Sequence, residues 1–100
     1  MSTQKFRWSR VYESSEEELM SLFAARNLTA QQVNAEAGSE PLEHTTKASM
    51  TLWCAEGSLT LYAEQSYISL QPGDAVRIDA KTSYSLTPGI SGFICYTTTQ

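Results

Sequence analysis

The chain has 100 residues, of which 41% are hydrophobic, and a formal net charge of −4. This length suits one compact domain with a single core, and the acidic balance argues against nucleic acid, which requires a concentrated basic surface. No run approaches the roughly 18 apolar residues of a membrane span, and the first 18 residues lack the apolar centre of a secretion signal. We therefore expect a cytoplasmic protein that binds neither nucleic acid nor membrane.

The first predicted element is a short helix at about residues 14–26. Ser14 or Ser15 precedes a glutamate by three residues, which is the spacing of a capping box. The run of three glutamates that follows suits the positive end of a helix dipole. The apolar residues at helical spacing, which give the helix a single apolar face, are Leu19, Leu22 and Phe23.

From residue 28 to about 97 the sequence predicts short strands separated by turns. Apolar and polar residues alternate with the period of two that is typical of half-buried strands. The residues predicted to face the core are Val33, Ala35, Ala37, Leu59, Leu61, Val76, Ile78, Phe93 and Cys95. In LQPGD, Pro72 and Gly73 suit the central positions of a type II turn. Regularly spaced strands without a second helix predict a small β-sandwich or barrel.

The two cysteines, Cys54 and Cys95, lie in apolar strand-like segments and lack CxxC spacing. This context predicts two buried, reduced thiols that fill core space. A redox or metal-binding role is the alternative. The two tryptophans, Trp8 and Trp53, are predicted to be packing anchors or residues of a dimer interface.

The order of these segments resembles a small single-domain cupin of the RmlC-like type, over residues 28–97. Gly57 stands where the first cupin motif ends in glycine, and Gly73 with Asp74 where the second motif begins. The short helix is similar to an N-terminal extension of some single-domain cupins. The resemblance implies a mainly β protein, a jelly-roll barrel with one short N-terminal helix occupying residues 1–100 as one domain. It also implies a frequent dimer and a ligand or metal site inside one mouth of the barrel.

The resemblance also places the metal ligands of the family on four positions of this chain. Where cupins have three histidines and a glutamate, the residues here are His44, Thr46, Met50 and Tyr84. A hydroxyl is a weak ligand, a thioether suits only soft metals, and a phenol binds metal poorly unless it is ionised. We therefore expect no metal cofactor, with His44 as a weak candidate ligand for a divalent ion.

Other positions near this motif depart from the cupin pattern or offer replacement ligands. The proline and glycine that precede the last histidine of the family are replaced by Asp79 and Lys81. The residues that could replace the missing metal ligands are Glu43, Cys54 and Glu64. Alternation sends neighbouring side chains to opposite faces of a strand, so few of them can join His44.

The predicted function is a metal-independent small-molecule-binding or regulatory module of unidentified ligand, rather than an enzyme. The predicted pocket residues are His44, Thr46, Met50, Tyr84 and Trp53, although the alternate position of Trp53 can send it to the other face. Two alternatives stay open. One is a metal-dependent enzyme of isomerase or oxygenase type with unusual ligands around His44, and the other is a structural dimerisation module with a filled core. A homodimer is expected because exposed strand edges need cover.

Overall fold

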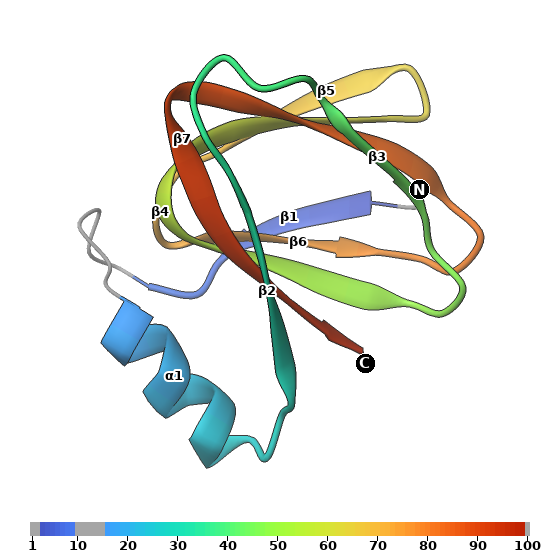
Figure 1. The fold of residues 1–100 in the computed structure, drawn as a ribbon. Coiled ribbons are helices and arrows are strands. Elements are labelled where there is room, and N and C mark those ends of the chain that lie inside the picture. The colour runs from blue at the N-terminus through green and yellow to red at the C-terminus, as the bar shows by residue number, and fades with distance from the viewer. Residues whose placement is uncertain (1–2, 10–15, 100) are drawn as a thin grey trace.

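The computed structural model describes residues 3–9 and 16–99 (Figure 1). Within these ranges the chain forms one helix and seven strands, and the seven strands belong to one antiparallel sheet. The elements are β1 Thr3–Arg7, α1 Glu16–Ala25, β2 Ala30–Ala35, β3 Leu42–Thr45, β4 Met50–Ala63, β5 Ser66–Leu70, β6 Asp74–Ile78 and β7 Ser83–Thr99.

Two long strands, β4 and β7, close the sheet into a barrel because each runs through both of its layers (Figure 1). The two strands pair with each other along their whole lengths. One layer has the strand order β1-β6-β4-β7-β2. In the other layer, β5 pairs with β4 and β3 pairs with β7. Register shifts between Cys54 and Glu56 and between Gly57 and Leu59 lie where β4 passes from one layer to the other. Such bulges bend a strand and increase its twist. The predicted mainly β jelly-roll barrel is confirmed.

The bend requires glycine at one point on each long strand. Gly57 has φ +75° and Gly92 has φ +74°, values that favour glycine strongly. A Cβ atom on Gly57 would overlap the carbonyl oxygen of Gly92, because the two backbones touch there.

The barrel interior is an apolar cluster that follows the predicted alternation. Leu59 and Leu61 on β4 are buried, whereas Tyr62, the residue that follows Leu61 on the same strand, points outward and is exposed. The predicted inward residues of β6 and β7 are likewise buried, and those of β2, Val33 and Ala35, are half-buried against the same cluster. Ala37 is the exception, since it lies beyond the end of β2 and is exposed.

The helix α1 packs on the outer face of the layer that contains β1 and β6 (Figure 1). Leu19 and Phe23 are its buried residues, and the ring of Phe23 meets that of Trp53 edge-on at 5.4 Å between centroids. The predicted helix and its apolar face are therefore confirmed; Ser14 and Ser15, the predicted capping residues, lie outside the described residues. In the described ranges no helix is long and apolar enough to cross a membrane.

The strand β1 is absent from the prediction, which began the barrel at residue 28. It pairs with β6, and its attachment depends on Asp74, which is buried at the start of β6. Arg7 Nη1 donates to Asp74 Oδ1 at 2.8 Å, and Lys5 Nζ lies 3.7 Å from Asp74 Oδ2. The indole N–H of Trp8 donates to the Asp74 carbonyl at 3.2 Å. An edge strand held by charges in this way shows no apolar alternation.

The predicted turn before β6 is confirmed. Gly73 has φ +96°, as the third residue of a type II turn requires. The amide of Asp74 donates to the Gln71 carbonyl at 2.9 Å and closes the turn. The Gln71 amide in turn donates to Asp74 Oδ2 at 2.9 Å, so one carboxylate fixes both the turn and β1.

Candidate functional site

The candidate site is a hollow between β2 and β3 at one end of the barrel, which we call the mouth pocket. His44 on β3 lies directly opposite Tyr84 on β7, and Tyr84 lies opposite Ala63 on β4. The rings of His44 and Tyr84 are 6.0 Å apart between centroids, at 62°. His44, Tyr84 and Met50, the last at the start of β4, line a hollow of about 380 Å³. A hollow of this size lies within the range of small-molecule sites, about 300–1,000 Å³.

Burial determines the chemistry of Tyr84 in this pocket. Burial raises the pKa of the Tyr84 phenol above its ordinary value, so the side chain is neutral at physiological pH and can donate a hydrogen bond. Its hydroxyl donates to Met50 Sδ at 3.9 Å. A thioether is a weak acceptor, and a ligand oxygen would therefore be a stronger partner for this hydroxyl. His44 is exposed at the rim, where it meets solvent and any entering molecule.

Thr46 does not line the mouth pocket, although the sequence predicts it there. Its hydroxyl donates to the Asp79 carbonyl at 2.7 Å and accepts from the Thr82 amide at 2.9 Å. The amide of Lys81 donates to the Thr46 carbonyl at 2.9 Å. Thr46 therefore joins the β3–β4 connection to the turn before β7, and its oxygen is not available to a ligand.

Trp53 is also absent from the mouth pocket. Its neighbours Leu52 and Cys54 point into the barrel, so alternation directs Trp53 to the outer face beneath α1. There its indole N–H donates to Thr98 Oγ1 at 2.9 Å. The structure thus supports a packing role for Trp53. Of the five predicted pocket residues, it brings three together in the mouth pocket: His44, Met50 and Tyr84.

Three polar residues that line the mouth pocket were not predicted from the sequence: Gln31, Gln32 and Thr97. Gln31 and Thr97 point into the barrel. Gln31 on β2 and Thr97 on β7 are opposite each other in register and both line the pocket. Alternation could have identified them, since Gln31 shares its face with Val33 and Thr97 shares its face with Cys95. Polar residues at inward positions near a barrel end are a usable signal for a pocket.

The residues present do not fit the metal that the cupin resemblance implies. The described ranges contain no group of three or more histidine, cysteine, aspartate or glutamate side chains that could hold a metal ion. A divalent ion generally needs three such ligands. At the family positions only His44 is a good ligand, since the Thr46 hydroxyl is engaged and Tyr84 is neutral.

Two of the replacement ligands proposed from the sequence, Glu43 and Glu64, line a hollow of about 630 Å³ together with His44. Within the described residues they do not form with His44 a group of three side chains that could hold a metal ion. Glu43 is the neighbour of His44 on an extended strand, which directs the two side chains to opposite faces. Cys54 lies deep in the barrel opposite Cys95, and Glu64 lies in the turn between β4 and β5.

The backbone of the second motif keeps an unusual geometry. Lys81, which stands where the resemblance places a glycine, has φ +61°. This left-handed conformation is unfavourable for residues other than glycine by roughly 1 kcal/mol. The Lys81 amide bond to Thr46 holds the turn in that conformation.

The two cysteines lie side by side in the interior. Cys54 and Cys95 are directly opposite in the pairing of β4 with β7, and both are buried and free. A hydrogen bond with the Cys54 thiol and burial both raise the pKa of the Cys95 thiol. The predicted burial of both thiols is confirmed, and no disulfide joins them in the structure.

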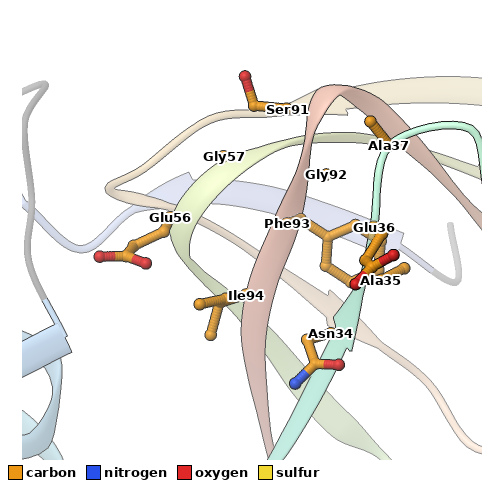
Figure 2. Close-up of a pocket in the computed structure, with 10 residues that line it drawn as sticks. All are labelled: Asn34, Ala35, Glu36, Ala37, Glu56, Gly57, Ser91, Gly92, Phe93 and Ile94. Carbon is orange, nitrogen blue, oxygen red and sulfur yellow. The ribbon is translucent and has the colours of Figure 1, made fainter.

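A separate hollow of about 570 Å³ lies at the bend of the two long strands (Figure 2). Gly57 and Gly92 form its floor, and the carboxylates of Glu36 and Glu56 stand on either side. None of the predicted pocket residues lines this hollow.

An antiparallel barrel closed by two long strands, with a short helix on its outer face, is a jelly-roll architecture. No family model matches the sequence, and no curated protein matches it. Solved structures do match. A DUF861 family protein from Thermotoga maritima has a TM-score of 0.64 at 11% identity, covering 98% of this chain and 99% of that one.

Other matching structures carry the cupin name. A cupin superfamily protein from Desulfitobacterium hafniense has a TM-score of 0.64 at 12% identity, over 97% of this chain and 75% of that one. An RmlC-like cupin from Shewanella frigidimarina has a TM-score of 0.62 at 15% identity, over 98% and 75%. These likenesses show that the chain has the small RmlC-like cupin fold, which confirms the predicted resemblance.

Proposed function

We propose that the mouth pocket binds a small organic molecule without a metal ion, and that the protein is a binding or regulatory module. The observation that carries the proposal is the neutral Tyr84 hydroxyl, whose only hydrogen-bond partner among the described residues is the sulfur of Met50 at 3.9 Å. Buried hydroxyl groups normally have strong partners. A ligand acceptor that replaced the sulfur would satisfy this one.

The lining suggests what such a ligand contains. Leu42, Met50 and Leu86 offer apolar surface, while Gln31 and Thr97 add polar groups on the β2 side. Apolar walls with a few convergent polar groups are the usual composition of a small-molecule site. The expected ligand has an apolar body and one acceptor that reaches Tyr84.

Thermal unfolding in the presence of a metabolite library tests this proposal. Tyr84→Phe removes one hydroxyl inside the pocket, and Ser85→Ala, on the next residue of β7 and the opposite face, is its matched control. We expect a compound that raises the melting temperature of wild type and of Ser85→Ala, but much less that of Tyr84→Phe. A ligand at 100 times its Kd stabilises the folded state by about 2.7 kcal/mol.

Two results would count against the proposal. One is a set of ligands that stabilise Tyr84→Phe and His44→Ala as strongly as wild type. The other is a broad library in which no compound shifts the melting temperature of wild type, as expected for a structural module with a filled core.

The homodimer expected from the exposed strand edges stays a prediction. Light scattering at micromolar concentration tests it, and a monomeric mass would contradict it.

A further inference from the structure

A second small pocket lies on the outer face of the barrel, beside the C-terminal end of α1. This open hollow has a volume of about 200 Å³, and we call it the arginine pocket. The residues that line it are Phe6, Arg26, Leu28, Thr51, Trp53 and Arg77. None of them lines the mouth pocket, and no aspartate or glutamate is among them.

Strand register explains how these residues meet. On the outer face, Arg77 of β6 lies opposite Thr51 of β4. In the next row, Ala75 of β6 lies between Phe6 of β1 and Trp53 of β4. The small side chain of Ala75 lets the two aromatic rings meet edge-on, 5.6 Å apart between centroids. The end of α1 then places the last lining groups, Arg26 and Leu28, over this corner.

The two arginines of this pocket differ from the other cations of the same layer. Lys5 and Arg7 both pair with Asp74. Within residues 3–9 and 16–99, Arg26 and Arg77 form no ion pair, although the chain carries a net charge of −4. Two guanidinium groups that share one hollow without a carboxylate favour an anion as occupant.

Thr51 supplies an independent observation. Its side chain is buried, with a relative exposure of 5%, yet its hydroxyl forms no hydrogen bond within the described part of the chain. No fully buried side-chain oxygen or nitrogen there lacks a partner. The Thr51 oxygen must therefore reach the small opening that it lines, where it is available to a ligand.

We propose that the arginine pocket binds a small aromatic carboxylate. The planar, forked guanidinium group binds carboxylate through two parallel hydrogen bonds, and Thr51 can donate a third. Phe6, which is 38% exposed, offers aromatic surface to a ring, and the buried Trp53 packs behind it. A cavity of about 150 Å³ is sufficient for benzene, so 200 Å³ accommodates a ring with its carboxylate.

The test is a titration with sodium benzoate, followed by ¹H–¹⁵N NMR at low salt. We expect saturable shifts at the amides of Thr51 and Arg77 and at the indole N–H of Trp53, with little change at His44 and Tyr84. Arg77→Gln should weaken binding by about tenfold, because it removes charge-assisted hydrogen bonds. Lys47→Gln, which makes the same change of charge at an exposed site outside this pocket, should bind as wild type does.

Three results would overturn the proposal. Benzoate could shift the amides around His44 and Tyr84 instead, could bind Arg77→Gln and Lys47→Gln equally, or could produce no saturable shift. Benzyl alcohol, which keeps the ring without the charge, must bind much more weakly than benzoate. Both arginines are exposed, so the variants should fold; Arg26→Gln repeats the test should Arg77→Gln prove unfolded by circular dichroism.

Discussion

The glycines at the bends of the barrel and the side chains at its mouth obey different physical constraints. At Gly57 the neighbouring backbone leaves no room for a Cβ atom, and the positive φ excludes most residues. At Met50 and Tyr84, by contrast, the barrel needs only side chains that fill space and find partners. The fold can therefore keep its turns while the side chains at its mouth vary. Substitutions at the two kinds of position should separate stability from binding.

The largest effect is expected at Gly57. Gly57→Ala should lower the free energy of unfolding by about 3 kcal/mol, because strain at positive φ adds to a clash with the Gly92 backbone. Gly38→Ala is the matched control, since Gly38 also has positive φ but no atom within 4 Å of a new Cβ, and should cost about 1 kcal/mol. Urea unfolding measures both. Equal losses would show that the close approach at the bend does not matter.

The next effect concerns Asp74, which joins the second motif to β1. Asp74→Asn should cost about 2 kcal/mol, because the buried carboxylate is bonded to Arg7 and to the Gln71 amide. Hydrogen exchange should also show loss of protection at the amides of β1. Arg7→Gln should cost less, since Arg7 is partly exposed. If β1 stayed fully protected in Asp74→Asn, the carboxylate would not be its anchor.

A pH-dependent effect should come from the interior. The pKa of the Cys95 thiol is raised in the folded state, so its stabilising contribution is complete below the ordinary thiol value of 9.0 and is lost as pH rises above it. The free energy of unfolding should fall there by up to about 1.4 kcal/mol per pH unit for this group. Cys95→Ala, measured under reducing conditions, should show a shallower fall. An identical slope would contradict the assignment.

The smallest effect on stability is expected at His44. His44→Ala removes an exposed side chain at the rim and should change the free energy of unfolding by no more than about 0.5 kcal/mol. Chemical denaturation checks this, with Thr45→Ala on the same strand as control. A loss greater than about 1.5 kcal/mol would mean that His44 is part of the fold rather than of the pocket.

Local patterns predicted much of this molecule and failed where distant contacts decide. The helix face at Leu19 and Phe23 follows from periodicity, and the turn at Gly73 follows from its residue types. The edge strand β1 is polar and depends on Asp74, 67 residues away from Arg7, so no local pattern reveals it. Thr46 was misplaced for the same reason, since its hydroxyl partners lie more than 30 residues away.

The arginine pocket on the outer face could not be predicted from local sequence patterns either. Alternation places Thr51 and Arg77 on outward positions of their strands, where isolated polar residues are ordinary. Only the pairing of β4 with β6 brings them together, and only the end of α1 adds Arg26. A pocket assembled from four elements leaves no motif in the sequence.

We propose above all that the mouth pocket binds its small-molecule ligand without a metal ion. Elemental analysis of protein purified without a tag, and without chelator, tests it most directly, together with the same measurement on His44→Ala. We predict far less than one divalent metal ion per chain in both proteins. One equivalent of metal in wild type that disappears in His44→Ala would contradict the claim and favour a metal-dependent enzyme with rebuilt ligands.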